Sequence, residues 1–176
     1  GVELVSTSDL LLPLWKERPE IPCTKIYKMK DEYAGFTASA KINFVKIKLR
    51  QQGADWTFIS SIDDIAWLTN LRANDIPCNP VFVAYVFISL EKAVLFVDKR
   101  RFDDSLFQEI SKDYEIRPYE SVYDDIASLT RRGVGFYSPE KISYAFAPAI
   151  NKKRNLRGCD ITTNLKARKN PVELEG

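Results

Sequence analysis

The sequence contains no histidine, and this absence is the most informative feature of its composition. A Ser-His-Asp or Cys-His catalytic arrangement needs an imidazole, so neither can be assembled from these residues. Zinc sites that use histidine are excluded for the same reason, and three scattered cysteines cannot supply four thiolates. The chain therefore offers no candidate residues for these catalytic arrangements or for these zinc sites.

Cysteines and long hydrophobic runs are also scarce. The cysteines, at positions 23, 78 and 159, are odd in number and lack short spacings. This is typical of reduced thiols in an intracellular protein, and we expect a cytoplasmic location. The longest apolar run, residues 81–90, is about half the ~20 residues of a membrane-spanning helix. We expect no membrane partner.

Neither sign of charge predominates. The 26 Lys and Arg residues against 24 Asp and Glu give a net charge of +2, too balanced to indicate nucleic-acid binding. A basic stretch at residues 152–169 lacks interleaved aromatic residues for base stacking and is typical of a solvated face. None of the seven glycines has the spacing of a phosphate-binding loop. No nucleic-acid partner is expected.

The 176 residues, 45% of them hydrophobic, predict one globular domain in which helices and strands alternate. Helices are predicted at residues 8–15, 37–52, 61–71, 103–110, 124–132 and 139–150. Strands are predicted at residues 55–60, 81–90, 93–98, 114–118, 134–137 and 159–165. This pattern predicts a single three-layer α/β domain, a mixed sheet of about six strands flanked by helices. The hairpin of residues 81–98 is hydrophobic almost throughout, which places it mid-sheet, covered on both faces.

Residues 37–52 fit two patterns. Val45, Ile47 and Leu49 alternate with basic residues as in a strand. However, Val45 and Leu49 also share one helical face, Thr37 is a suitable N-cap, and Gly53 is a suitable terminator. Because the segment is too long for a typical strand, we predict a helix.

Three acidic pairs begin predicted helices, at residues 63–64, 103–104 and 124–125. Paired carboxylates can bind a divalent metal or share a proton. In the first turn of a helix they also favour the free N–H groups and the helix dipole, by about 0.3–1 kcal/mol each. Capping explains all three pairs together and is the interpretation we prefer.

Polar residues are concentrated in the loop of residues 70–80, between strongly apolar elements. Loops held by a rigid sheet often carry binding sites. Alternatively, Arg72 and Asp75 tie the loop together, and residues 79–80 start the next strand. The residues alone leave both interpretations open.

At this loop the sequence resembles cytosolic aminopeptidase P. The resemblance is carried by residues 61–75 (SIDDIAWLTNLRAND), by residues 79–82 (NPVF), by Tyr85 and by residues 95–98 (LFVD). In that family this pattern belongs to the second, non-catalytic domain. Residues 14–19 (LWKERP) are similar to the segment that enters the domain, and residues 166–176 to the segment that leads out of it.

The resemblance implies a creatinase N-terminal-like middle domain at residues 1–165 and a linker at 166–176 into a catalytic domain with the pita-bread fold. The implied parent enzyme removes the N-terminal residue from peptides with proline in the second position. It holds two divalent ions, usually manganese, and a homodimer is a possible assembly of the full enzyme. None of its metal ligands maps onto this chain, so we expect a fragment that is inactive alone and needs no cofactor.

The resemblance also implies partners for the domain: the catalytic domain of the same protein and the peptide substrate. Candidates for facing the substrate cleft are Arg72, Asp75 and Asn79, with Tyr85 as a weaker one. Arg72 is suited to a paired contact with a carboxylate. Ala73 stands where the family often has glycine, so the loop backbone is expected to differ locally.

An alternative class is a protein-binding module. Relatives with a pita-bread domain include histone chaperones that have lost catalysis and use similar N-terminal domains for recognition, but they lack the motif of residues 61–75. The creatinase branch fits less well, because its two-domain layout has no counterpart of residues 14–19.

Overall fold

The computed structural model describes residues 5, 7, 9–146, 149, 150, 155–157 and 160–175, with only the backbone described at 155–157. Its helices are α1 (Asp31–Ala34), α2 (Ala38–Gln51), α3 (Ile62–Thr69), α4 (Asp104–Ile110), α5 (Val122–Leu129), α6 (Ile161–Ala167) and α7 (Pro171–Glu175). Its strands are β1 (Tyr27–Lys28), β2 (Trp56–Ile59), β3 (Leu71–Arg72), β4 (Tyr85–Ser89), β5 (Ala93–Phe96), β6 (Glu115–Arg117), β7 (Gly135–Tyr137) and β8 (Asn155–Arg157). Short 3-10 turns are η1 (Lys99–Arg101), η2 (Tyr119–Ser121), η3 (Pro139–Lys141) and η4 (Tyr144–Phe146).

The main sheet has six strands in the order β6-β5-β4-β2-β7-β8. Strand β4 is antiparallel to both of its neighbours, while the β5–β6, β2–β7 and β7–β8 pairs are parallel. The predicted mixed sheet with a central β4–β5 hairpin is therefore confirmed. Because β4 alone runs in the opposite direction, the carboxyl ends of the other five strands lie at one edge of the sheet. A separate antiparallel pair, β1–β3, was not predicted.

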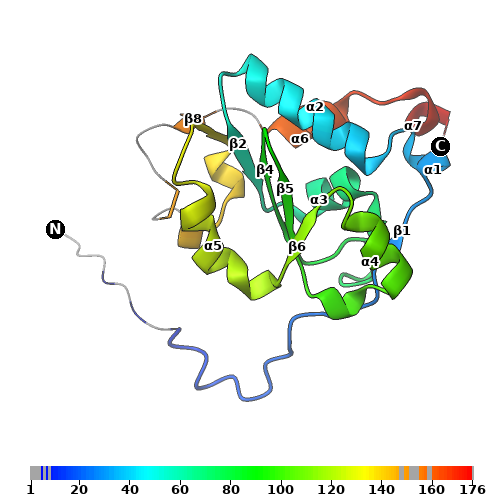
Figure 1. Cartoon of the computed structure of the whole chain (residues 1–176). Helices are drawn as coiled ribbons and strands as arrows, with labels where there is room; N and C mark the ends of the chain where they lie inside the picture. The colour runs from blue at the N-terminus through cyan, green and yellow to red at the C-terminus, as the bar shows by residue number, and fades with distance from the viewer. Residues whose placement is uncertain are drawn as a thin grey trace.

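Helices cover the sheet on both faces (Figure 1). Side chains alternate along β4: Val86 and Ile88 join one core, which is covered by α2, α3, α4 and α6. Phe87 joins a second, aromatic core, which is covered by α5 and η4. The predicted burial of the hairpin on both faces follows from this arrangement.

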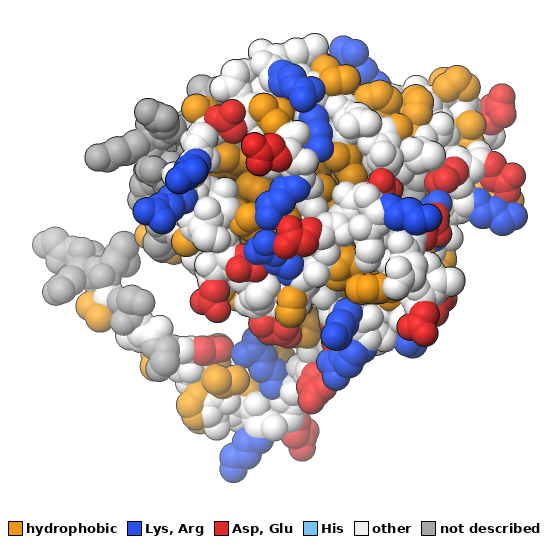
Figure 2. All heavy atoms as spheres, in the orientation of Figure 1, with side chains coloured by type: hydrophobic (Ala, Val, Ile, Leu, Met, Phe, Trp, Pro, Cys, Tyr) orange, Lys and Arg blue, Asp and Glu red, His pale blue; other side chains and the backbone are white. Residues whose placement is uncertain are grey.

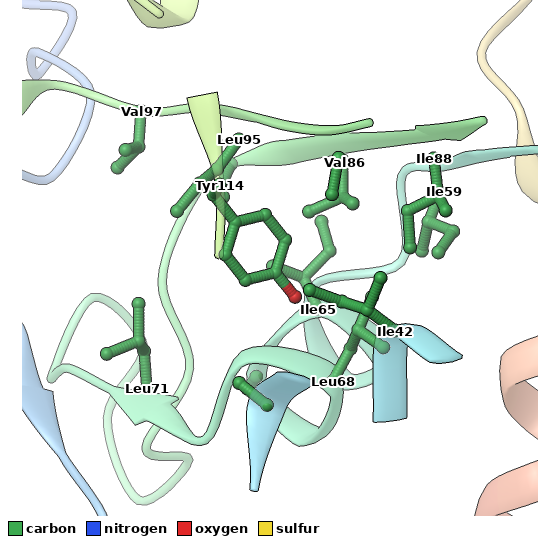
Figure 3. Close-up of a cluster of buried hydrophobic side chains, with 14 of the residues drawn as sticks. Ile42, Ile59, Ile65, Leu68, Leu71, Val86, Ile88, Leu95, Val97 and Tyr114 are labelled. Carbon is green, nitrogen blue, oxygen red and sulfur yellow. The ribbon is translucent and has the colours of Figure 1, made fainter. Parts of the chain in front are cut away.

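The first core surrounds a tyrosine ring. Tyr114, between α4 and β6, lies among aliphatic side chains from α2, α3 and the sheet, including Ile42, Ile65 and Leu95 (Figure 3). Its side chain is fully buried, and its hydroxyl has no hydrogen-bond partner among the residues that the structure describes. Within the described part of the chain, the first core therefore holds a buried hydroxyl without a hydrogen-bond partner.

Helix α2 is confirmed, and its cap is the predicted one. The Thr37 side chain accepts a hydrogen bond from the N–H of Ala40, at 3.2 Å. After the helix, Gly53 adopts φ +66°. Buried side chains follow the helical period through Ile42, Val45 and Leu49, so packing selects the helix over the strand.

The predicted helix at residues 8–15 was wrong. Residues 10–17 form turns, in which the Asp9 carboxylate accepts hydrogen bonds from the N–H groups of Leu11 and Leu12. Pro13 removes a backbone donor from the segment. Leu11 and Trp15 stay more than half exposed, so no apolar face is buried that would stabilise a helix.

Two predictions in the last quarter were also wrong. In place of the helix predicted at residues 139–150, Pro139–Lys141 and Tyr144–Phe146 form separate 3-10 turns, because Ile142 is extended and interrupts the helix. Residues 161–165 are helical rather than a strand, because Asp160 caps α6 by accepting from the N–H of Thr163 at 3.1 Å. The last strand is β8, at Asn155–Arg157, and Cys159 lies outside the described residues. Smaller shifts concern α5, which begins at residue 122, and residues 81–84, which precede β4 and lie outside the sheet.

Candidate functional site

Arg72 lies on β3, beside β1 and at the carboxyl end of α3. Its Nη1 donates to the carbonyl oxygens of Leu71, at 2.9 Å, and of Ala66. Its Nη2 lies 3.8 Å from the Met29 sulfur. Burial lowers the pKa of Arg72, with Tyr27 acting against this. Within the described part of the chain no carboxylate pairs with this half-buried guanidinium, so it retains capacity for an anion.

Asp75 is directed inward instead. Its side chain is fully buried and pairs with Arg101 at 2.6 Å. It also accepts from the Thr24 hydroxyl at 2.5 Å and from the Val83 N–H at 2.9 Å. Burial opposes the charge on Asp75, but these donors outweigh it, so its pKa lies below the ordinary aspartate value. Asp75 therefore joins residues 24, 83 and 101 around the loop.

Asn79 closes a tight turn within the loop. Its N–H donates to the carbonyl of Ile76 at 3.1 Å, and Cys78, inside the turn, adopts φ +61°. The side chain is half-buried, and its Nδ2 lies 3.4 Å from an Asp63 oxygen at the start of α3. Asn79 therefore links the loop to α3.

Tyr85 belongs to the other face of the sheet. Its ring packs against Phe58, Tyr119 and Phe146, with centroids 5.1–5.7 Å apart across this cluster. The Tyr119 hydroxyl donates to the Tyr85 oxygen at 3.4 Å. Burial and this neighbour raise the pKa of Tyr85 to about 12, so the phenol stays neutral at physiological pH.

The structure does not bring the four candidates into one constellation. The side chain of Arg72 contacts α3 and Met29, that of Asp75 contacts Arg101, and that of Asn79 contacts α3. Tyr85 lies across the sheet from all three. Among them, Arg72 alone combines partial exposure with a charge that lacks a charged partner in the described residues.

Sequence reasoning missed a buried lysine beside this loop. Lys41, in α2, is 1% exposed, and its Nζ donates to Asn70 Oδ1 at 2.6 Å and to the Trp67 carbonyl at 2.8 Å. The same ammonium lies 4.5 Å from the Trp67 ring centroid. Burial lowers the pKa of Lys41 to about 8. A signal was present: Lys41 is three residues after Ala38 and four before Val45, on the apolar stripe of α2.

The two motif regions of the resemblance meet at this lysine. Trp67 Nε1 donates to a Glu173 oxygen at 3.1 Å, although 106 residues separate them. Glu173 and Asn170 form a capping box at the start of α7, with reciprocal hydrogen bonds of 3.0 and 3.1 Å. Asn170 also donates to the Ala34 carbonyl in α1, at 3.1 Å. Residues 166–175, expected to be a linker, thus pack against α1 and α3.

The acidic pairs serve different purposes. Asp103 is an N-cap as predicted, because its side chain accepts from the Leu106 N–H at 2.8 Å. Asp64, however, is fully buried and pairs with Lys141 at 2.8 Å and Lys166 at 2.6 Å. Although burial opposes it, these lysines lower the pKa of Asp64. Capping alone was therefore a wrong explanation of the pair at residues 63–64.

The described residues do not fit a metal centre. Across them, no group of three or more Asp, Glu, Cys or His side chains is arranged to hold an ion. The buried carboxylates of Asp64 and Asp75 are each bound by cationic side chains.

On the face shown in Figure 2, acidic and basic side chains are intermingled. No helix among the described residues has the length and apolarity to cross a membrane.

The fold and sequence match a known family. The family model of the creatinase/prolidase N-terminal domain matches residues 17–173. The chain belongs to this family. Xaa-Pro aminopeptidase 1 from Dictyostelium discoideum is 31% identical over 161 residues, covering 92% of this chain and 26% of the relative. A probable Xaa-Pro aminopeptidase P from Laccaria bicolor is 32% identical, covering 99% and 28%. The predicted resemblance to an aminopeptidase P domain is confirmed.

Solved structures agree. The X-prolyl aminopeptidase of Caenorhabditis elegans, described as a cytosolic enzyme with a di-nuclear active site, matches with TM-score 0.89 and 26% identity. The match covers 96% of this chain and 28% of that one. An aminopeptidase P structure from Streptococcus thermophilus shares the fold at TM-score 0.54 and 15% identity. The creatinase N-terminal-like fold is therefore established, and the chain spans less than a third of the curated relatives it matches.

Proposed function

We propose that the chain is a non-catalytic domain of a metallo-aminopeptidase that removes the N-terminal residue from peptides with proline in the second position. The family match over residues 17–173 is the observation that supports this most strongly. The relatives, which are Xaa-Pro aminopeptidases, support the reaction. The C. elegans enzyme, which is cytosolic and has a di-nuclear active site, supports a cytoplasmic location and two metal ions.

In this proposal the two metal ions, which we take to be manganese, are held outside this chain. The buried carboxylates here already have cationic partners, and the sequence provides no imidazole. The chain alone is therefore expected to have no peptidase activity.

The domain packs against the catalytic domain and limits access to the cleft. Arg72 is the group best suited to the contact, because backbone carbonyls position its guanidinium and no described carboxylate neutralises it. Such a guanidinium can bind a carboxylate through two parallel hydrogen bonds. Asp75 acts indirectly in this scheme by fixing the loop, and Asn79 links the loop to α3.

A domain exchange tests the proposal. The segment of the C. elegans enzyme that matches this chain is replaced by residues 9–175, and hydrolysis of an Xaa-Pro peptide is measured with added Mn²⁺. The exchanged enzyme is expected to cleave the peptide, whereas the 176-residue chain alone is not. Turnover by the chain alone would contradict the proposal, and so would a chimera that folds cooperatively by circular dichroism but leaves the peptide intact.

The role of Arg72 is tested in the same chimera. Arg72→Ala is expected to lower kcat/KM about tenfold, which corresponds to losing about 1.4 kcal/mol of transition-state contact. Arg72→Lys is expected to restore little, because lysine cannot form the paired contact. Arg50→Ala, on the exposed surface of α2, is the matched control. A lower melting temperature with unchanged kcat/KM would show that Arg72 is purely structural.

A further inference from the structure

The connections that follow the neighbouring strands β5 and β6 run to opposite faces of the sheet. Both strands run in the same direction and lie side by side. The chain leaves β5 through η1 into α4, on the face covered by α2 and α3, and it leaves β6 through η2 into α5, on the opposite face (Figure 1). A crevice outside the carboxyl ends of such neighbouring strands is where open α/β sheets bind ligands.

A pocket of about 490 Å³ occupies this position. One wall is apolar and consists of Phe107 from α4, Ile116 from β6 and Pro118 after it. The remaining lining side chains are charged and come from the two diverging loops. The volume falls in the range of small-molecule sites, about 300–1,000 Å³.

Most of the charged groups around the pocket are already neutralised. The Arg100 guanidinium binds Asp98 through Nε at 3.0 Å and Nη2 at 2.6 Å. Arg117 pairs with Asp125 at 2.9 Å and Glu115 at 2.6 Å. Each of these two arginines is therefore already paired with at least one carboxylate.

Two lining charges remain, one of each sign. Lys99 follows β5 and Glu120 follows β6, and both are exposed. Neither side chain makes a hydrogen bond or ion pair with any residue that the structure describes, and Glu120 affects Arg100 only as a nearby charge. An ammonium on one loop, a carboxylate on the other and an apolar wall between α4 and β6 form a complementary set.

We propose that this crevice binds a zwitterionic ligand with an apolar side chain: a free apolar amino acid or a dipeptide. The ligand carboxylate pairs with Lys99, its ammonium pairs with Glu120, and its side chain contacts the apolar wall. The proposal is independent of the peptidase assignment, because every group it uses belongs to this chain.

Binding is tested on the purified chain by titration calorimetry and by amide chemical-shift mapping. The probes are leucine, the dipeptide Leu-Gly, leucinamide, N-acetyl-leucine and N-acetyl-leucinamide, which carry both, one or neither of the two charges. Leucine or Leu-Gly is expected to bind with a Kd on the order of millimolar. The chemical-shift changes should centre on residues 98–100 and 117–120. If leucine binds more tightly than Leu-Gly, the ligand is a free amino acid, and if Leu-Gly binds more tightly, it is a dipeptide. N-acetyl-leucinamide should bind at least about fivefold more weakly.

Variants assign the two charges. Lys99→Met should weaken the binding of leucine about fivefold and leave the binding of leucinamide unchanged. Glu120→Gln should weaken the binding of leucine and leave the binding of N-acetyl-leucine unchanged. Lys112→Met and Glu91→Gln are matched controls, because both residues are exposed and lie outside the pocket. The proposal is overturned if neither zwitterion saturates the site, if the uncharged probe binds as tightly, or if the variants match their controls.

Discussion

Replacing Tyr114 by phenylalanine should make the protein more stable. The Tyr114 hydroxyl is fully buried among aliphatic side chains (Figure 3), and no described residue forms a hydrogen bond with it. A buried polar group without a partner costs about 1–3 kcal/mol. Phenylalanine removes that cost and keeps the ring contacts, while the small space left by the oxygen offsets part of the gain. We expect a net increase of about 1 kcal/mol in the free energy of unfolding.

The assay is urea unfolding at pH 7, followed by fluorescence and circular dichroism, with thermal unfolding as a second measurement. For a chain of this length, about 1 kcal/mol corresponds to a rise in melting temperature of about 2–4 °C. Tyr144→Phe is the matched control: Tyr144 is 84% exposed, so its substitution should change neither quantity.

Alkaline pH provides an independent test of the same reasoning. Burial raises the pKa of Tyr114 above its ordinary value, so the folded protein keeps the proton that the unfolded chain loses above about pH 10. The wild type should therefore lose stability as pH rises above 10, by up to about 1.4 kcal/mol per pH unit from this group, and the variant should lose less. A variant destabilised by 1 kcal/mol or more would show that the hydroxyl has a stabilising partner. A variant with the wild-type alkaline dependence would show that burial does not raise the pKa of Tyr114.

Three further predictions concern the packing around α3, each measured by urea unfolding. Gly35→Ala should lower the free energy of unfolding by at least about 1 kcal/mol more than Gly53→Ala. Both glycines have positive φ, but only at Gly35 would the added methyl group collide with a side chain, that of Asn170, which caps α7. Asp64→Asn should lower the free energy of unfolding by about 2–4 kcal/mol, because it breaks two ion pairs of a buried carboxylate. Asp63→Asn, at an exposed position, should lower it by less than about 0.5 kcal/mol. Because the pKa of Asp64 is lowered, this difference should shrink as pH falls below about 4, and equal losses would contradict the buried ion pairs. Burial lowers the pKa of Lys41 to about 8, so between about pH 8 and 10 this lysine is protonated only in the unfolded chain. The free energy of unfolding should therefore rise over this pH range. A Lys41→Met variant that keeps the same rise would refute the lowered pKa of Lys41.

Local signals predicted the central part of the fold. The cap at Thr37, the apolar period of α2 and the continuous hydrophobicity of the β4–β5 hairpin each depend on residues close together in sequence. The wrong secondary-structure predictions occurred where contacts between residues far apart in the sequence determine the local conformation. The β-branched residues at 161–163 favour a strand locally, but Asp160 starts a helix that contributes Ile161 to the first core.

The candidate site was harder to predict for the same reason. The loop of residues 70–80 was recognisable, but the direction of each side chain was not, since Asp75 pairs with an arginine 26 residues away. Lys41 was detectable as a charge on an apolar stripe. Its pairing with the amide of Asn70 and its position over Trp67 depend on how α2 crosses α3, which periodicity does not specify.

The contact between Trp67 and Glu173 has a practical consequence for anyone who shortens this protein. A version that stops at residue 165 would lose one of the two lysines that neutralise Asp64 and would strip the indole of its acceptor. The final eleven residues, 166–176, should therefore be retained in expression trials, because Lys166 and Glu173 hold α3 in place through Asp64 and Trp67.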